Sequence, residues 1–303
     1  MPSGRQMDAP ARLTVFAMTS KGLAVLATLL ADYPGLVAAV VVGRDTSIEN
    51  DHADEIIALC DRHATPVQAR AAEFRIETSH ALAVSWRWMI EPGTARLIVV
   101  HDSLLPRHRG FNPLVTALIE GDAAIGVTAL YASSEYDRGD IIAQVSIPVE
   151  HPIRIADAIA LACGCYRDLA MRIGDWLAGG IEPPALAQDE SVATYSLWRD
   201  DDDYEIDWTL DAARIERTVH ALGPPYRGAS TWVAGRKARV GEVAMVPDVV
   251  IANRTPGKVI FMDHGRPVVV CGTGLLRIDG LVDAKTGKSF LPLARFRTRF
   301  GAR

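Results

Sequence analysis

The chain has 303 residues, of which 49% are hydrophobic and 23% are charged, and its formal net charge is −5. This composition is typical of a folded globular protein and excludes a mostly disordered chain. The acidic balance leaves no basic footprint, so we do not expect a nucleic-acid partner. The length favours two domains.

Residues 1–12 are polar and lack the apolar stretch of a signal peptide. No later run reaches the roughly 18 apolar residues of a membrane span. The four cysteines form no Cys-x-x-Cys pair, and we interpret them as buried thiols in a chain with no metal site. We therefore expect a cytoplasmic protein without a membrane partner.

Short apolar runs alternate with segments of helical spacing in the first part of the chain. All-apolar strands between helices predict a mostly parallel sheet buried on both faces, in an α/β, Rossmann-like domain. The predicted strands cover residues 13–18, 36–42, 65–68, 81–84, 97–100, 126–131 and 141–149, and the predicted helices cover residues 23–30, 56–63 and 155–177.

The pattern changes after about residue 190. An acidic run at residues 200–203 is typical of a solvated linker, and a short helix is expected over residues 212–221. Five short β-like segments between residues 229 and 278 predict a small, OB-like β-barrel. We therefore divide the chain into domains at residues 1–195 and 196–303.

A polar segment, HDSLLPRHRG at residues 101–110, directly follows the predicted strand 97–100. Ligands of parallel sheets bind outside the carboxyl ends of the strands, where loops carry catalytic groups. A second polar turn, residues 136–140, would open on the same edge if the two preceding strands are parallel neighbours. His101 and Asp137 could then approach each other.

A histidine held by a carboxylate is a general acid–base device. The ionised carboxylate favours the imidazolium, which can stabilise an oxyanion and protonate a leaving group. The residues alone leave two interpretations open. His101 and Asp137 either form such a pair, or they cap the ends of a strand and a turn.

Residues 101–110, read with GVT at 126–128 and DRGDII at 137–142, resemble the signature of the folate-dependent formyltransferases. That family includes methionyl-tRNA, glycinamide ribonucleotide and sugar-nucleotide formyltransferases, and its loop reads approximately N-x-H-x-S-L-L-P-x-x-R-G, followed by G-x-T and D-x-G-x-I. IDW at 206–208 and PPYRGA at 224–229 resemble the C-terminal barrel of the methionyl-tRNA and aminoarabinose formyltransferases.

The resemblance implies a one-carbon transferase of class EC 2.1.2 with 10-formyltetrahydrofolate as cosubstrate. In that mechanism the acceptor amine attacks the formyl carbon, an oxyanion forms, and N10 of the folate leaves after protonation. His101 is then the implied general acid–base and oxyanion partner. Asp137 is the implied group that orients His101 and a proton-relaying water.

One position departs from the family pattern. The family places an Asn two residues before the His, and this chain has Val99 there. Valine cannot donate the hydrogen bond that Asn would give the formyl oxygen, and losing one such donor costs roughly 10²–10³ in rate. Ser103, Asn112 or a backbone N–H are candidates for the missing donor, and Arg109 has a structural or acceptor role.

The family holds the pterin between the segment before the loop and the turn that carries the Asp. The flat rings of Trp86 and Trp88 suit such a ligand, although each can equally be a core aromatic. The resulting cosubstrate-binding residues are Trp86, Arg87, Trp88, Met89, Ile90, Leu104, Ser133, Ser134, Glu135 and Tyr136.

The leading hypothesis is formyl transfer to a small-molecule amine, such as an amino sugar nucleotide or a natural-product amine. One alternative is a formyltetrahydrofolate hydrolase, or a transferase with another acyl or formimidoyl donor. A methionyl-tRNA formyltransferase ranks lower because the acidic chain shows no basic arm. A catalytically weak folate-binding relative and a homodimer also stay open.

Overall fold

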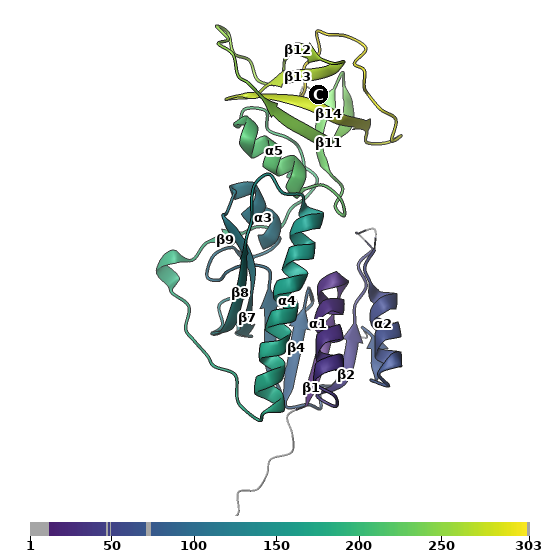
Figure 1. The fold of residues 1–303 in the computed structure, drawn as a ribbon, viewed down its shortest axis with the longest axis vertical. Helices are drawn as coiled ribbons and strands as arrows, with labels where there is room; N and C mark the ends of the chain where they lie inside the picture. Colours follow the sequence, from purple (N-terminus) through teal and green to yellow (C-terminus); the bar gives the residue numbers. More distant parts are fainter. Residues whose placement is uncertain (1–11, 47, 49, 71–73, 302–303) are drawn as a thin grey trace, which may run out of the picture. The chain divides into compact units, whose positions relative to one another are not determined.

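The computed structural model of the chain describes residues 12–46, 48, 50–70 and 74–301. Residues 1–11, on which the expected absence of a signal peptide rests, lie outside the described residues. The chain forms two compact units (Figure 1). Among the described residues, the first unit covers the chain up to residue 110 together with residues 126–147 and 159–195, and the second covers residues 111–125, 148–158 and 196–301.

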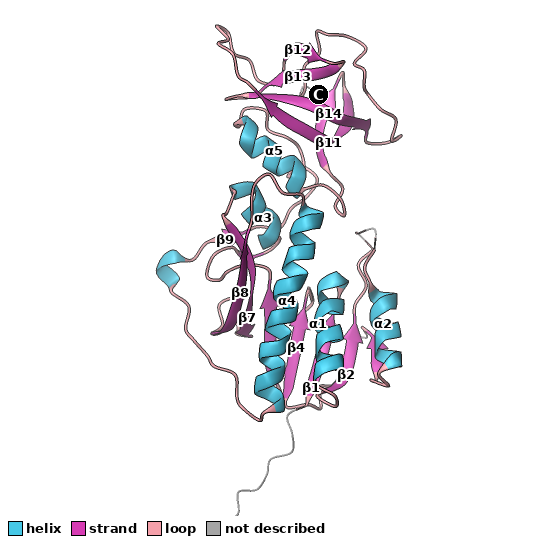
Figure 2. Cartoon of the chain, viewed as in Figure 1, coloured by secondary structure: helices cyan, strands magenta, loops and turns pink. Residues whose placement is uncertain are grey.

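A seven-stranded sheet of order β3-β2-β1-β4-β5-β7-β8 forms the centre of the first unit (Figure 2). The pairs β1–β2, β1–β4, β2–β3 and β4–β5 are parallel, and β5–β7 is antiparallel. The predicted α/β fold with a mostly parallel sheet is therefore confirmed. The strands are β1 (Leu13–Ala17), β2 (Val37–Val42), β3 (Val67–Ala69), β4 (His80–Val84), β5 (Arg96–His101), β7 (Ala124–Tyr131) and β8 (Ile141–Pro148).

Three helices pack on one face of this sheet: α1 (Thr19–Asp32), α2 (Ala53–Arg62) and α4 (Ile155–Ala178). Side chains alternate along each strand. Val15 of β1 therefore lies in the core beneath the helices, whereas Phe16 faces the opposite side. That opposite side carries a smaller apolar cluster, in which the side chains of Trp86 and Val99 pack against the sheet.

The second unit contains a five-stranded antiparallel sheet of order β10-β11-β14-β13-β12. Helix α3 (Pro113–Glu120) packs against α5 (Ala212–Ala221), where Arg214 forms an ion pair with Glu120. The closed, OB-like form of this sheet stays a prediction. The remaining elements are β6 (Arg109–Gly110), η1 (Glu190–Val192), β9 (Tyr195–Ser196), β10 (Ala229–Val233), β11 (Arg236–Val246), β12 (Val259–Asp263), β13 (Arg266–Val270) and β14 (Leu275–Asp283).

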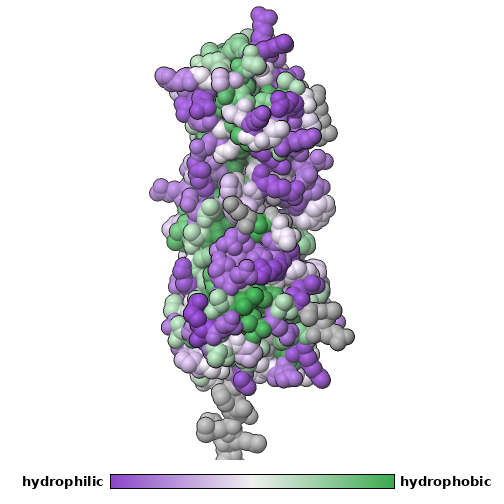
Figure 3. Space-filling view, turned by 90° about the vertical axis from the view of Figure 1, so that its right-hand side faces the viewer, coloured by the Kyte–Doolittle hydropathy of each residue, from purple (hydrophilic) through white to green (hydrophobic). Residues whose placement is uncertain are grey.

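The two units do not follow a single cut in the sequence. The chain enters the second unit for the last time at residue 196, next to the predicted boundary, but residues 111–125 and 148–158 also belong to that unit. Over the described part of the chain, no helix has both the length and the apolar character that a bilayer crossing requires. The face drawn in Figure 3 mixes polar residues with small, separated apolar patches.

A substitution of Gly126 on β7 tests the packing beneath the loop that follows β5. A Cβ there would lie 2.4 Å from the carbonyl oxygen of Val145 and 2.5 Å from Cδ2 of Leu104. We expect Gly126→Ala to destabilise the protein by at least about 2 kcal/mol in urea unfolding, because β7 cannot yield without disturbing the sheet.

The matched control is Gly164→Ala in α4, where a Cβ meets no atom within 4 Å. This variant should gain about 0.5–1 kcal/mol, because alanine favours the helix. Equal unfolding free energies for the two variants would contradict the packing at Gly126.

Candidate active site

His101 ends β5, and its side chain is only 8% exposed. Its Nδ1 lies 3.4 Å from Oδ1 of Asp137, and its Nε2 lies 2.9 Å from the carbonyl oxygen of His108. Because a carbonyl oxygen only accepts, Nε2 is the nitrogen that carries a hydrogen. Nδ1 is therefore the nitrogen that faces Asp137 and can exchange a proton.

Asp137 reaches His101 by a different route from the one expected. The sequence argument assumed parallel neighbouring strands, and this assumption is wrong, because β5 and β7 are antiparallel. The turn after β7 instead brings Asp137 back to the carboxyl end of β5, with its own backbone in the left-handed region (φ 57°). Asp137 Oδ2 also accepts the backbone N–H of Gly110 at 2.8 Å, which ties the two segments together.

Gly139 allows this turn to form. A Cβ at residue 139 would lie 1.7 Å from the carbonyl oxygen of Tyr131, so the position accepts only glycine. The D-x-G spacing of the motif thus has a steric reason in this chain: the glycine lets the chain pass close to β7 while Asp137 turns towards His101.

The Thr128 hydroxyl holds the loop that follows His101. Its Oγ1 accepts the N–H of Leu105 at 3.1 Å and donates to the carbonyl oxygen of Ser103 at 2.6 Å. Gln144 of β8 donates to the same Oγ1 at 2.9 Å and to the carbonyl oxygen of Leu105 at 2.8 Å. The G-x-T motif therefore fixes the loop backbone, with help from Gln144, which the sequence analysis missed.

Ser103 and Asn112 were candidates for the missing oxyanion donor. Ser103 is 3% exposed, and its Oγ donates its one hydrogen to the carbonyl oxygen of Arg107 at 2.6 Å. Asn112 occupies the N-cap position of α3 in the second unit, where its side chain makes no capping hydrogen bond. The structure thus commits the Ser103 hydroxyl to its own loop.

Arg109 is fully buried, at 0% exposure. Its guanidinium donates to Gln188 at 2.7 and 3.1 Å, to Glu190 at 2.8 and 2.9 Å, and to the Tyr195 hydroxyl at 3.3 Å. Hydrogen bonds from Arg109 also lower the pKa of the Glu190 carboxyl. Arg109 therefore clamps the loop that follows β5 to the segment around residues 188–195 and directs its donors to the chain rather than to an acceptor.

Val99 lies on the sheet face opposite the core that α1, α2 and α4 cover. It pairs with Ala83 of β4 and Leu130 of β7, and its side chain packs in the cluster that includes Trp86. Since side chains alternate along β5, Val99 and His101 share this face. The wall beside His101 is therefore apolar where the family pattern has an amide.

The two segments predicted to hold the cosubstrate meet at Met89 and Tyr136. Both side chains are exposed, at 78% and 70%, and the Tyr136 hydroxyl lies 3.3 Å from Sδ of Met89. Trp86 and Ile90 belong to the apolar cluster on the sheet face opposite α1, α2 and α4. Trp88 packs edge-to-face on Trp86, with ring centroids 5.0 Å apart.

The other predicted binding residues are engaged within the chain. The Trp88 ring is covered by the guanidinium groups of Arg70 and Arg87, at 4.2 and 5.1 Å, and Arg87 forms an ion pair with Asp45. Leu104 packs over Gly126. Ser133 donates to the carbonyl oxygen of Glu135 within the turn that leads to Asp137, while Ser134 is exposed.

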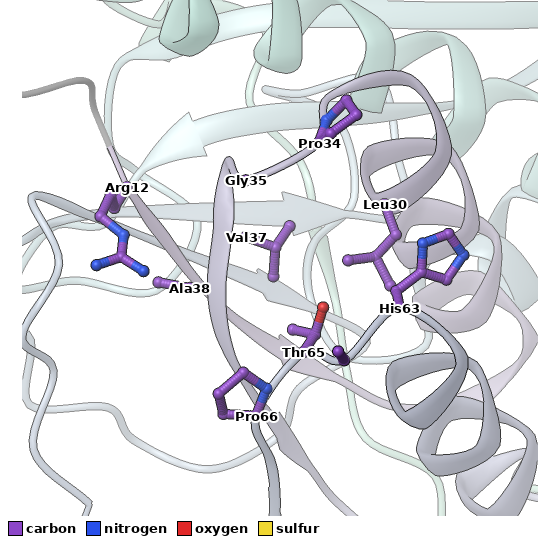
Figure 4. Close-up of a pocket in the computed structure, with 10 residues that line it drawn as sticks. Arg12, Leu30, Pro34, Gly35, Val37, Ala38, His63, Thr65 and Pro66 are labelled. Atoms are coloured by element: carbon purple, nitrogen blue, oxygen red, sulfur yellow. The ribbon is translucent and has the colours of Figure 1, made fainter.

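A pocket in the first unit lies at the opposite edge of the sheet. It is formed where α1 leads into β2 and where α2 leads into β3, as Figure 4 shows. These connections stand at the amino ends of the strands, whereas His101 stands at a carboxyl end. Its lining includes Arg12 and His63 but none of the predicted site residues.

Comparison with known proteins points in one direction. Residues 63–157 match the family described as formyl transferase, and residues 199–292 match the formyl transferase C-terminal domain. The methionyl-tRNA formyltransferase of Syntrophomonas wolfei is 30% identical over 203 residues, which cover 67% of this chain. The chain spans only 63% of the length of that relative.

Two solved structures share the fold. The sugar 3N-formyltransferase WlaRD, solved in the presence of dTDP and 5-N-formyl-THF, has a TM-score of 0.70 and 13% identity over 89% of this chain and 97% of its own. HypX from Aquifex aeolicus, in complex with tetrahydrofolic acid, has a TM-score of 0.60 and 18% identity over 91% of this chain and 45% of its own.

Thr128→Val tests the clamp on the loop. The substitution keeps the shape of the fully buried side chain. It removes the hydrogen bonds that the hydroxyl makes with the Ser103 carbonyl, the Leu105 N–H and the Gln144 amide. We expect a loss of about 2–4 kcal/mol in the free energy of unfolding.

The control is Thr28→Val, which removes a single hydroxyl bond to Ala24 within α1. It should change stability by no more than about 0.5 kcal/mol. If Thr128→Val unfolds at the same urea concentration as this control, the hydroxyl does not hold the loop.

Proposed function

Because the chain belongs to the formyltransferase family, we propose that it transfers a formyl group from 10-formyltetrahydrofolate to the amine of a small molecule. The observation that carries the proposal is the pair of the buried His101 and the partly buried Asp137 at the carboxyl end of β5. The pair has the acid–base chemistry that amide formation at a formyl carbon needs, and the loop around it is clamped by hydrogen bonds to Thr128.

The surroundings of the pair suit a folate. The exposed, polarisable side chains of Met89 and Tyr136 lie in contact. The sheet face opposite α1, α2 and α4, which His101 shares, is lined by apolar residues that include Trp86. A flat aromatic body with a polar rim gains from such a surface. These residues would hold the cosubstrate.

The chemistry falls to His101 and Asp137. The cosubstrate supplies an electrophilic formyl carbon and a nitrogen leaving group. Nδ1 of His101 accepts the proton that the attacking amine loses, because Nε2 is committed to the His108 carbonyl. The positive charge of the resulting imidazolium would stabilise the developing oxyanion, Nδ1 would return the proton to the leaving nitrogen, and the Asp137 carboxylate stabilises the charged ring.

The acceptor we favour is an amino sugar nucleotide or a natural-product amine. The likeness in fold to WlaRD over 97% of that chain supports a sugar acceptor, and the net charge of −5 argues against a nucleic acid. Methionyl-tRNA is the second candidate, supported by the identity of 30% to a methionyl-tRNA formyltransferase.

Product analysis by mass separates these candidates. The protein is incubated with 10-formyltetrahydrofolate and a dTDP-amino sugar, with methionyl-tRNA, or with no acceptor. Formylation of the sugar amine supports the proposal, and formylation of the tRNA supports the second candidate. Formate release without any acceptor identifies a hydrolase. Failure both to consume and to bind the folate overturns the proposal.

Substitution of the pair should abolish most of the activity. We expect His101→Ala and Asp137→Asn each to lower kcat by at least about 10², because each removes a group that moves or stabilises the proton. His63→Ala, at the opposite edge of the sheet, is the control and should keep the wild-type rate. Near-normal turnover in both site variants would remove the pair from the mechanism.

Val99→Asn restores the amide of the family pattern. We expect kcat to rise about 10-fold or more, because one oxyanion donor commonly contributes 10²–10³. Leu97→Asn changes the same strand face two residues farther from His101 and should bring no gain. A flat or lower rate in Val99→Asn would instead indicate a donor or acceptor adapted to the apolar wall.

A further inference from the structure

A buried ionic cluster lies directly behind His101. Asp102 follows His101 in the chain, and its Oδ2 forms an ion pair with Nζ of Lys21 in the first turn of α1. Its Oδ1 accepts the hydroxyl of Tyr166, in the middle of α4, at 2.7 Å. Lys21 is 8% exposed and Tyr166 is 1% exposed. Both oxygens of the carboxylate are thus held by helices from the covered face of the sheet.

Stability alone is a weak reason for such a cluster. Moving two charges out of water costs several kcal/mol per ion, and apolar side chains of similar size often serve a fold equally well. The motif of the catalytic loop does not call for Asp102, and the proposed proton transfer does not use it. A role linked to the neighbouring His101 accounts for its position.

The charged and polar groups around His101 come from the turn after β7, the loop after β5, and the helices α1 and α4. Asp137 approaches from the turn after β7, and the carbonyl of His108 from the loop. Asp102 stands at the end of β5, with Lys21 of α1 on one oxygen. Helix α4 contributes Tyr166, which contacts Asp102, and Cys163, whose thiol lies 3.7 Å from the Ser20 hydroxyl.

The cluster holds its charges at neutral pH. Burial acts to raise the pKa of the Asp102 carboxyl, but the ion pair with Lys21 and the hydrogen bond from Tyr166 outweigh burial and keep this pKa below its ordinary value. Burial and the Asp102 carboxylate raise the pKa of Tyr166 well above 10, so its hydroxyl stays a donor. The positive and negative charges therefore balance one residue away from the imidazole.

We propose that Lys21, Asp102 and Tyr166 are positioning residues for His101: they pin the end of β5 so that the imidazole stays against Asp137, and they set the local charge at which it exchanges its proton. This inference rests on the proposed function for its kinetic consequence. Its electrostatic consequence for His101 does not require activity.

Asp102→Asn and the double variant with Lys21→Met test the charge. Asp102→Asn removes the negative charge of the carboxylate and keeps the Lys21 cation, which disfavours the imidazolium. The ring resonances of His101, followed by NMR over a pH series and assigned with His101→Ala, should titrate at lower pH in Asp102→Asn than in the wild type. The double variant removes both charges and should return the midpoint close to the wild-type value. The acidic limb of kcat/KM should move in the same way.

Tyr166→Phe tests the positioning without a change of charge. We expect kcat to fall by about 10-fold with KM within about threefold, because a displaced imidazole harms the chemical step more than binding. The titration midpoint should stay in place. This variant keeps the inference testable even if Asp102→Asn fails to fold.

Glu120→Gln is the control for charge, because it removes one negative charge from an ion pair in the second unit. It should leave the His101 midpoint unchanged. Unaltered midpoints in Asp102→Asn together with wild-type kcat in Tyr166→Phe would overturn the inference. A shifted midpoint in a protein that transfers no formyl group would overturn the proposed function and leave the electrostatic inference standing.

Discussion

The carboxylate of Asp137 is the point on which the candidate site depends. One oxygen faces Nδ1 of His101 and the other accepts the N–H of Gly110, so a single side chain joins the end of β5, the far end of its loop and the turn after β7. Without that carboxylate, a protonated His101 ring would lose the negative charge beside it, and the loop would lose the hydrogen bond at Gly110. The Thr128 hydroxyl and the Arg109 guanidinium hold the same loop from its two sides.

Local signals in the sequence were enough for the sheet and the long helix, whereas the pairing of His101 with Asp137 was implied only by the family motif. Apolar runs and turns depend on neighbouring residues, and the motif carries its own spacing. The direction of β7 could not be obtained this way, because strand pairing depends on residues far apart in the chain. The same holds for the partners of Arg109, which lie about eighty residues later, and for the cluster of Lys21, Asp102 and Tyr166, which three separate elements bring together.

Val99 determines which groups can stabilise the oxyanion in the proposed reaction. An apolar side chain beside the imidazole leaves the oxyanion to the ring itself and to the backbone of a loop whose conformation is heavily constrained. Two residues of that region, His108 and Asp137, adopt left-handed backbone conformations that non-glycine residues rarely take. Such strain persists only where surrounding contacts enforce it, and it is common at functional sites.

The hydrogen bond from Nε2 of His101 to the His108 carbonyl has a consequence for the path of the proton. An imidazole with both nitrogens available can take a proton on one side and release it on the other, as a shuttle between two compartments. With one nitrogen committed to the chain, the proposed reaction requires the ring to take up a proton and return it at the same atom. The group that loses the proton and the group that receives it would therefore occupy the same side of the histidine in turn.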